Sequence, residues 1–225
     1  MHLPDDLQNL PRYPLLGPHL RRSDLCPISL DVRQPEISRL ELTTYEQLEA
    51  HIAEHLLRHQ ASGAIGGYLE KRDLYRSSPH FRTSGADRCI HLGIDIWLPA
   101  GSPLFVPLNA RVHSFAYNDQ PLDYGATILL EHRFGKIHFF TLYGHLSLAS
   151  LQKLHEGQAL QAGQPLATIG NRDENGGWVP HLHLQLITDL RGWKGDFPGV
   201  CSEAELDLFR QICPEPTILV VQPEP

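Results

Sequence analysis

The 225-residue sequence lacks the features of membrane and nucleic-acid-binding proteins. Apolar runs such as 126–130 and 218–221 fall far short of the roughly 20 residues that a membrane-spanning helix needs. Positive charge is in deficit, because 19 Lys and Arg stand against 26 Asp and Glu, giving a net charge of −7. Such a chain has no field that would gather phosphate backbones or acidic lipid. We therefore expect no membrane span and no nucleic-acid partner.

Cysteine and export signals are also scarce. Four cysteines without a Cys-x-x-Cys pair favour reduced, buried thiols over a disulfide framework. The first residues, 1–7, lack the basic leader and apolar core of a signal peptide. The expected location is the cytoplasm, or outside the cell if a leader has been removed. The sequence leaves the oligomeric state open.

The remaining composition, 41% hydrophobic and 20% charged, is typical of one globular domain with an appendage. Residues 1–42 contain many prolines and predict an extended arm. Thr44 and Gln47 resemble a capping box, and the apolar spacing that follows predicts a helix over 45–60. A second, short helix is expected over 202–211.

Beyond Arg88 the sequence predicts strands. Short apolar runs are separated by turn residues, and their connections are too short for crossover helices, so we expect antiparallel pairing. The expected strands cover 104–106, 111–117, 126–132, 136–143, 165–169 and 181–188. We accordingly divide the chain into an N-terminal arm and helix packing on the core (1–87), a β domain (88–190) and a C-terminal extension (191–225).

The spacing of several histidines indicates a possible metal-binding site. His181 and His183 lie two apart on an expected strand and so share one face, while the leucines between and after them face the opposite way. Such a pair is either a preset nitrogen site for a metal such as Zn²⁺ or the polar face of an edge strand. His91 and Asp95, four residues apart, share a face in a helix or a strand. His145 follows another expected strand and by itself indicates little.

Together these residues resemble the lysostaphin and LytM type of zinc metallopeptidases. The shared elements occur in the same order over residues 88–189: His-x-x-x-Asp, Tyr-x-His-Leu, a Gly-to-Gln stretch over 157–164, Ile-Gly, and Pro-His-Leu-His. The resemblance implies an antiparallel β-sandwich with an open groove, Zn²⁺ as cofactor, and hydrolysis of peptide bonds in peptides or peptidoglycan fragments.

The resemblance also assigns roles to individual residues. It implies that His91, Asp95 and His183 bind zinc, with His145 and His181 as catalytic groups beside it. Three protein ligands leave one tetrahedral position open, as a catalytic zinc site requires. We favour His181 as the base and His145 as the partner of the oxyanion and leaving group, although the two roles are interchangeable at this stage.

The region near the last motif departs from the family. Where the family commonly has Thr-Gly before Pro-His-Leu-His, this chain has Gly-Gly-Trp-Val, so the loop over 171–179 is its own. Trp178 and Tyr143 are candidates for binding substrate, or else they pack in the core. Gln185, one strand step beyond His183, either orients a ligand or is solvated.

Other interpretations stay open. The chain is either an enzyme or a non-catalytic, metal-containing module that binds peptides. A hydrolase acting on a small soluble amide is a further alternative, because no export signal accompanies the expected cell-wall substrate. His51, His55 and His59 recur every four residues on the expected helix. They are either a second metal stripe or, as we expect, a solvated helical face.

Overall fold

The computed structural model describes residues 7–8, 10–40, 42–74, 82–83 and 86–220. The start of the predicted arm, 1–6, lies outside the described residues. The helices and 3-10 turns are η1 (Arg22–Asp24), α2 (Pro35–Ser38), α3 (Tyr45–His59), η4 (Leu148–Leu151), η5 (Glu203–Glu205), α4 (Leu206–Ile212) and η6 (Pro216–Leu219). The strands are β1 (Leu25–Pro27), β2 (Gly63–Gly66), β3 (Arg82–Thr83), β4 (Ala86–Asp87), β5 (Ile90–His91), β6 (Ile94–Trp97), β7 (Pro103–Phe105), β8 (Ala110–Asn118), β9 (Gly125–Phe134), β10 (Ile137–Leu146), β11 (Ala159–Leu160), β12 (Pro165–Thr168), β13 (His181–Ile187) and β14 (Val200–Cys201).

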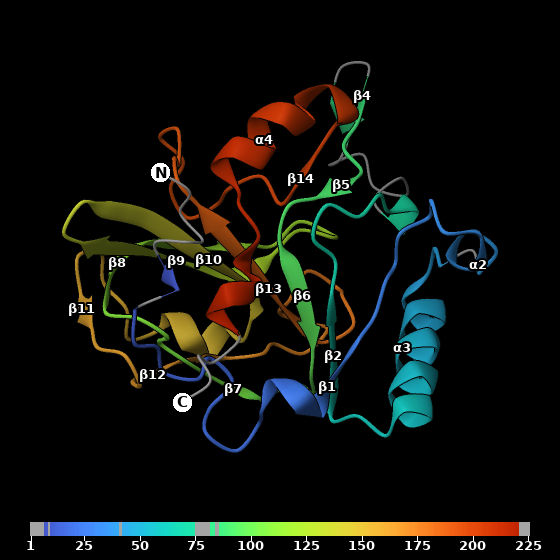
Figure 1. Cartoon of the computed structure of the whole chain (residues 1–225), viewed down its shortest axis with the longest axis horizontal. Coiled ribbons are helices and arrows are strands. Elements are labelled where there is room, and N and C mark those ends of the chain that lie inside the picture. The colour runs from blue at the N-terminus through green and yellow to red at the C-terminus, as the bar shows by residue number, and fades with distance from the viewer. Residues whose placement is uncertain (1–6, 9, 41, 75–81, 84–85, 221–225) are drawn as a thin grey trace.

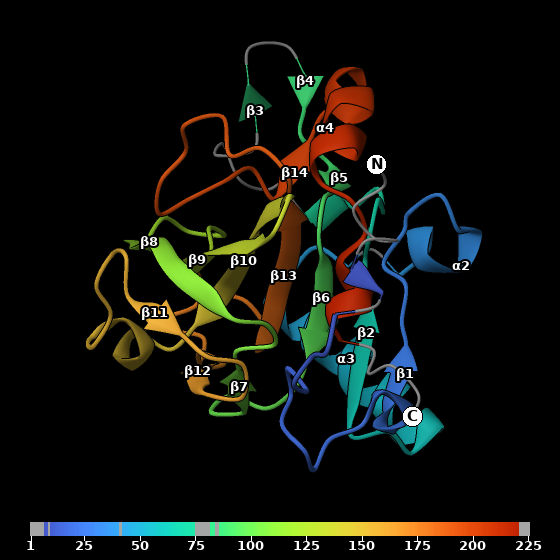
Figure 2. The ribbon, with the colours of Figure 1, turned by 60° about the vertical axis from the view of Figure 1, so that its left-hand side comes forward.

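One sheet of eight strands dominates the molecule. Its order is β1-β2-β6-β13-β10-β9-β8-β11 (Figure 2). Every neighbouring pair in it is antiparallel except β1 with β2, which is parallel. The predicted, mainly antiparallel β fold is therefore confirmed. The N-terminal region contributes two strands that were not predicted from the sequence, β1 and β2, which extend the sheet beyond β6.

Strand alternation divides the core into two sides of this sheet. On β13, Leu182, Leu184 and Leu186 are fully buried in a cluster with apolar residues of β6, β9 and β10. Each buried leucine side chain contributes about 1.5–3 kcal/mol of transfer free energy. His181 and His183 alternate with these leucines and so project from the other face. The leucine face anchors the strand that carries the histidines.

Helix α3 covers the sheet at the end formed by β1 and β2 (Figure 1). The Thr44 hydroxyl accepts a hydrogen bond from the backbone N–H of Gln47, and the Gln47 side-chain oxygen accepts one from the backbone N–H of Thr44, so the predicted capping box and helix are confirmed. Leu48 and Ile52 are buried in a cluster that includes Cys26 and Leu30. Helix α3 thus packs against β1 and the residues that directly follow it.

Two further expectations concern the whole chain. All four cysteines are buried, as predicted. Within the described part of the chain, none of the helices has the length and apolar character needed to span a membrane.

Candidate functional site

The register of the sheet brings His91, Asp95 and His183 together. In the antiparallel pair of β6 and β13, Asp95 lies directly opposite His183. His91 ends β5, and the chain turns at Leu92 and Gly93 before β6 begins. Gly93 is needed at this turn, because a Cβ atom there would lie 2.7 Å from His183 Nε2 and 2.6 Å from the Leu184 carbonyl oxygen. The close approach of this turn to β13 places the three side chains in one buried cluster.

Hydrogen bonds on the outer side of each ring fix which histidine nitrogen faces the cluster. His91 Nδ1 lies 2.9 Å from the Gly67 carbonyl oxygen, which can only accept, so this nitrogen carries the proton. His183 Nε2 lies 3.1 Å from Gln185 Oε1. The Gln185 amide is oriented in turn because its nitrogen donates to the Pro198 carbonyl oxygen. With these tautomers, His91 Nε2 and His183 Nδ1 turn unprotonated lone pairs toward the cluster.

The resulting donor set fits a divalent metal ion. His91 Nε2 and His183 Nδ1 are 2.9 Å apart, and Asp95 Oδ1 lies 3.3 Å from the first and 3.2 Å from the second. Three lone-pair donors cannot hydrogen-bond one another without a proton between them, but they can share a cation. A tetrahedral zinc site with bonds of about 2.0–2.1 Å has donor atoms about 3.3–3.4 Å apart, close to these separations. Imidazole nitrogen and carboxylate oxygen are also ligands that zinc accepts.

The other carboxylate oxygen of Asp95 is held by Arg72. Arg72 Nη1 donates to Asp95 Oδ2 at 2.5 Å, and Arg72 Nε and Nη2 donate to Glu70 Oε2 at 3.1 and 3.0 Å. Glu70 Oε2 also accepts a hydrogen bond from the backbone N–H of Leu30. All three charged side chains are buried. The arginine therefore occupies Oδ2 and leaves Oδ1 turned toward the two histidines.

The same surroundings set the protonation states that metal binding requires. Burial, aided by the positive charge of Arg72, lowers the pKa of His91 to about 4, so its ring is neutral at pH 7. Burial alone would raise the pKa of Asp95, but His91, Arg72 and His181 together lower it well below its usual range. A neutral imidazole and an ionised carboxylate are the forms that ligate metals.

His145 and His181 lie beside the cluster, with their ring centroids 4.2 Å apart and the ring planes tilted by 40°. His145 Nδ1 donates to the Asn175 carbonyl oxygen at 2.8 Å, and His181 Nδ1 donates to that of Val179 at 2.7 Å. Both rings thus keep a basic Nε2. Burial is the main cause that lowers the pKa of each ring, so both are neutral at pH 7. His181 Nε2 lies 3.7 Å from Asp95 Oδ1.

His145 has a backbone conformation that the sequence did not reveal. Its φ is 61°, in the left-handed region that few residues other than glycine adopt, and it sits where the pairing of β10 with β9 is irregular. The preceding Gly144 lies opposite His183 in the pairing of β10 with β13. This irregularity sets the His145 ring beside the histidines of β13, and such local strain is common at functional sites.

A cavity of about 130 Å³ opens on these histidines. It is lined by His91, Asp95, His145, His181 and His183, with Trp178 among its apolar walls. The structure thus places Trp178 at the cavity, where the sequence analysis expected a substrate contact.

The other two predicted substrate contacts lie elsewhere. Tyr143 is fully buried in the cluster on the leucine face of β13, because it pairs with Leu184, and its neighbour Gly144 pairs with His183. The prediction that Tyr143 binds substrate is therefore wrong. Gln185 is fully buried and holds His183, which matches the predicted ligand-orienting alternative and leaves no direct contact with substrate.

Several residues around the cavity were not predicted. Gly67 and Arg72 hold the cluster from the N-terminal region, and Leu30, Leu48 and Leu74 line the cavity from the same region. No local motif marks these residues, because their role arises only from the packing of the arm on β6.

One family of known proteins matches the segment that carries the motifs. The model of peptidase family M23 matches residues 89–194. No curated protein matches the chain. Similar solved structures include a zinc-containing peptidase from Vibrio cholerae, which is 25% identical with a TM-score of 0.35 over 47% of this chain and 30% of that one. Another is the catalytic domain of the antimicrobial peptidase lysostaphin from Staphylococcus simulans, which is 19% identical with a TM-score of 0.39 over 57% of this chain and 85% of that one.

Proposed function

Residues 89–194 form a lysostaphin/LytM-type peptidase domain of family M23, and from this premise we propose that the protein is a zinc-dependent metalloendopeptidase. The observation that carries the proposal is the convergence of three unprotonated donor atoms, His91 Nε2, His183 Nδ1 and Asp95 Oδ1, within 3.3 Å of one another. These residues would hold the zinc ion. The substrate class we propose, from the resemblance to this type of enzyme, is peptides of the peptidoglycan stem or bridge.

The side chains beside the cluster suit amide hydrolysis. A zinc ion in this position would polarise a peptide carbonyl group and make water more acidic. His181, with a neutral ring and a basic Nε2 that is 3.7 Å from Asp95 Oδ1, can take the proton from the attacking water. As the bond from the carbonyl carbon to nitrogen breaks, this proton can pass to the leaving amine. His145, whose ring centroid lies 4.2 Å from that of His181, offers a second unprotonated Nε2, so it would accept a hydrogen bond from the attacking water and would donate to the developing oxyanion only after taking up a proton.

A second candidate function is hydrolysis of a small soluble amide. The observation in its favour is that Leu30, Leu48 and Leu74 line the cavity although they lie outside the segment that matches the family. Parallel assays on cross-linked peptidoglycan and on short soluble peptides would separate the two. Turnover of the short peptides alone would favour this second candidate.

Two histidine variants test the assignment of roles. His183→Ala removes a proposed ligand and should lose the bound zinc and all hydrolysis. His145→Asn should keep the zinc and lower kcat at least 100-fold, as expected when a group acting in the transition state is removed. Asparagine is chosen because it tolerates the positive φ at this position.

Zinc content by mass spectrometry and hydrolysis with and without a chelator are the measurements. Equal zinc loss in both variants would show that His145 is a ligand. Full zinc occupancy without turnover on peptidoglycan, oligoglycine or muropeptides would favour a non-catalytic binding module.

A further inference from the structure

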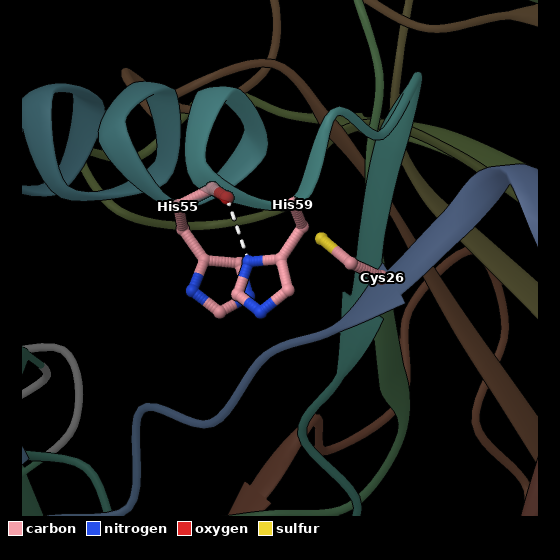
Figure 3. Close-up of side chains that lie close together, drawn as sticks. All are labelled: Cys26, His55 and His59. Atoms are coloured by element: carbon pink, nitrogen blue, oxygen red, sulfur yellow. Dashed lines mark hydrogen bonds between the residues drawn. The ribbon is translucent and has the colours of Figure 1, made fainter.

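A second cluster of metal-ligating side chains lies away from the cavity, where the last turns of α3 face β1. It consists of Cys26, His55 and His59 (Figure 3). Each of the three offers one nitrogen or sulfur atom, and these atoms lie within 4.8 Å of one another. Cys26 is buried, His55 is half-buried and His59 is exposed. The cluster thus has a sheltered sulfur and an opening to solvent.

The helix presents the two histidines together. Residues four apart lie on one face of a helix, and here the ring centroids of His55 and His59 are 4.2 Å apart. His59 Nδ1 donates to the His55 carbonyl oxygen at 2.9 Å, so its Nε2 keeps a lone pair. His55 Nε2 donates to the Pro27 carbonyl oxygen at 2.9 Å, which holds its ring against β1 beside Cys26. His59 is thus oriented with a free Nε2, whereas His55 would exchange its hydrogen bond to Pro27 for a bond to the ion if it binds through Nε2.

Cys26 changes the interpretation of this helical face. The stripe that includes His51, His55 and His59 was expected to be solvated, but β1 places a thiol under its C-terminal end. The Cys26 thiol is 3.5 Å from the Gly63 carbonyl oxygen, and burial raises its pKa, so the sulfur carries a proton at neutral pH. A bound cation would displace that proton, as cysteine ligation of metals requires.

We propose that Cys26, His55 and His59 form a second metal site, for a transition-metal ion that accepts thiolate and imidazole ligands, with Zn²⁺ as the expected occupant. One thiolate and two imidazoles form a donor set that zinc accepts, with a fourth position left for water. The site is distinct from the cluster of His91, Asp95 and His183 and does not depend on the hydrolytic function.

A metal ion here would join α3 to β1. Both elements contribute to one buried cluster, in which Leu48 of α3 and Leu30, soon after β1, also line the cavity of the catalytic site. The expected consequence is a stability that depends on the metal, because an ion that binds only the folded chain stabilises it by mass action. The proposed role is therefore a clamp that fixes one wall of the cavity.

The test uses the full chain under reducing conditions, with His183→Ala to remove the first site. Titration with Co²⁺ should give a thiolate-to-cobalt charge-transfer absorption that saturates at one equivalent. Adding Cys26→Ser should abolish this absorption, and adding His59→Ala should weaken Co²⁺ binding at least 10-fold. His59 is exposed, so its substitution should leave the fold intact. His51→Ala, on the same helix but outside the cluster, is the matched control and should keep the absorption.

Zinc stoichiometry separates this proposal from the catalytic one. The unmodified chain should bind two equivalents of Zn²⁺, and His59→Ala and His183→Ala should each remove a different one. Loss of the second equivalent should also lower the melting temperature. No charge-transfer absorption in His183→Ala, or an absorption that survives Cys26→Ser, would overturn the proposed site. A chain that binds zinc only through Cys26 and His59 would instead overturn the proposed catalytic site and support this one.

Discussion

At the scale of single residues, the cluster of His91, Asp95 and His183 depends on neighbours outside the proposed set of ligands. The carbonyl oxygen of Gly67 and the side-chain oxygen of Gln185 accept hydrogen bonds from the outer N–H groups of His91 and His183, and Arg72 donates to Asp95 Oδ2. Such neighbours fix the tautomer and the orientation of a ligand. Arg72 is the most exceptional of them, because its buried guanidinium pairs with two buried carboxylates, those of Glu70 and Asp95.

Replacing Arg72 by Met should weaken the proposed zinc site and the fold together. Asp95 loses the group that orients it, so zinc affinity should fall about 10–100-fold. Removing one partner of a buried ion pair also costs about 3–5 kcal/mol, because the remaining charge is uncompensated. Competition with a chelator and urea unfolding measure the two effects.

Arg58→Met is the matched control for this substitution. The Arg58 ion pair with Glu54 is exposed, so its loss should change stability by less than about 1 kcal/mol. Unchanged zinc affinity in Arg72→Met would mean that the arginine stabilises the fold without positioning Asp95.

A histidine outside the site predicts how stability depends on pH. Burial lowers the pKa of His132 to about 4, and the ring lies between the Asn109 carbonyl oxygen and the Thr141 hydroxyl. The unfolded chain, with a histidine pKa of about 6.5, binds this proton first as the pH falls. The stability from this residue is therefore complete above about pH 6.5 and is lost toward pH 4, on the order of 3 kcal/mol in total.

His132→Gln tests this dependence. Urea unfolding between pH 4 and pH 7 should show a shallower fall in stability for the variant than for the unmodified protein. The substitution of an exposed histidine, His155→Gln, controls for the change of residue type. Parallel curves for His132→Gln and the unmodified protein would show that His132 takes up its proton without cost in the folded state.

At the scale of secondary structure elements, the site is a product of strand register. Asp95 on β6 and Gly144 on β10 flank His183 on β13, so three neighbouring strands contribute to one place. The turn between β5 and β6 completes the site, because it places His91, the last residue of β5, beside Asp95 and His183. The alternation of β13 could be predicted from the sequence, because leucines alternate with His181, His183 and Gln185.

Register between strands could not be predicted in the same way. Tyr143 and Gly144 are adjacent on β10, and only the pairing with β13 shows that Gly144 lies opposite His183. Similarly, β1 and β2 are short and lack a polar and apolar alternation, so nothing local distinguishes them from an irregular arm. The capping box of α3 was predictable because its residues lie three apart in the sequence.

Gly93→Ala should disturb the turn between β5 and β6. The added methyl group would lie 2.7 Å from His183 Nε2, so either the ring or the turn must move. A displacement of about 1 Å at a catalytic centre can cost about 100-fold in rate. We expect kcat/KM to fall at least that far, measured on a peptide substrate.

Gly101→Ala is the control for this substitution. Its Cβ would meet no atom within 4 Å, although its φ of 84° makes alanine strained there. It should lower stability by about 1–2 kcal/mol and leave kcat/KM unchanged. Equal rates in the two variants would contradict the role of Gly93 in placing His183.

At the scale of the whole molecule, the N-terminal region and the β domain share one site. Strand β2 pairs with β6. Gly67 and Arg72 form hydrogen bonds with His91 and Asp95, and Leu48 lines the cavity. The expected division into 1–87, 88–190 and 191–225 stays a prediction. A boundary at residue 88 separates Gly67 and Arg72 from the side chains with which they form hydrogen bonds, because His91 and Asp95 lie after it.

A chain restricted to residues 88–225 tests this dependence. It exposes the edge of β6 and leaves Asp95 without Arg72, so we expect aggregation or zinc affinity at least 10-fold weaker than that of the full chain. Circular dichroism and zinc titration are the measurements. A monomeric, fully folded fragment with unchanged zinc affinity would show that the N-terminal region is dispensable for the site.

The central claim is that His91, Asp95 and His183 hold one metal ion and leave a position open to water. X-ray absorption at the zinc edge, on the Cys26→Ser variant loaded with one equivalent of Zn²⁺, tests this most directly. The account predicts only nitrogen and oxygen neighbours at about 2.0–2.2 Å, two of them imidazole, and loss of the imidazole signal in His183→Ala. A sulfur neighbour at about 2.3 Å, a third imidazole, or no bound zinc would contradict it.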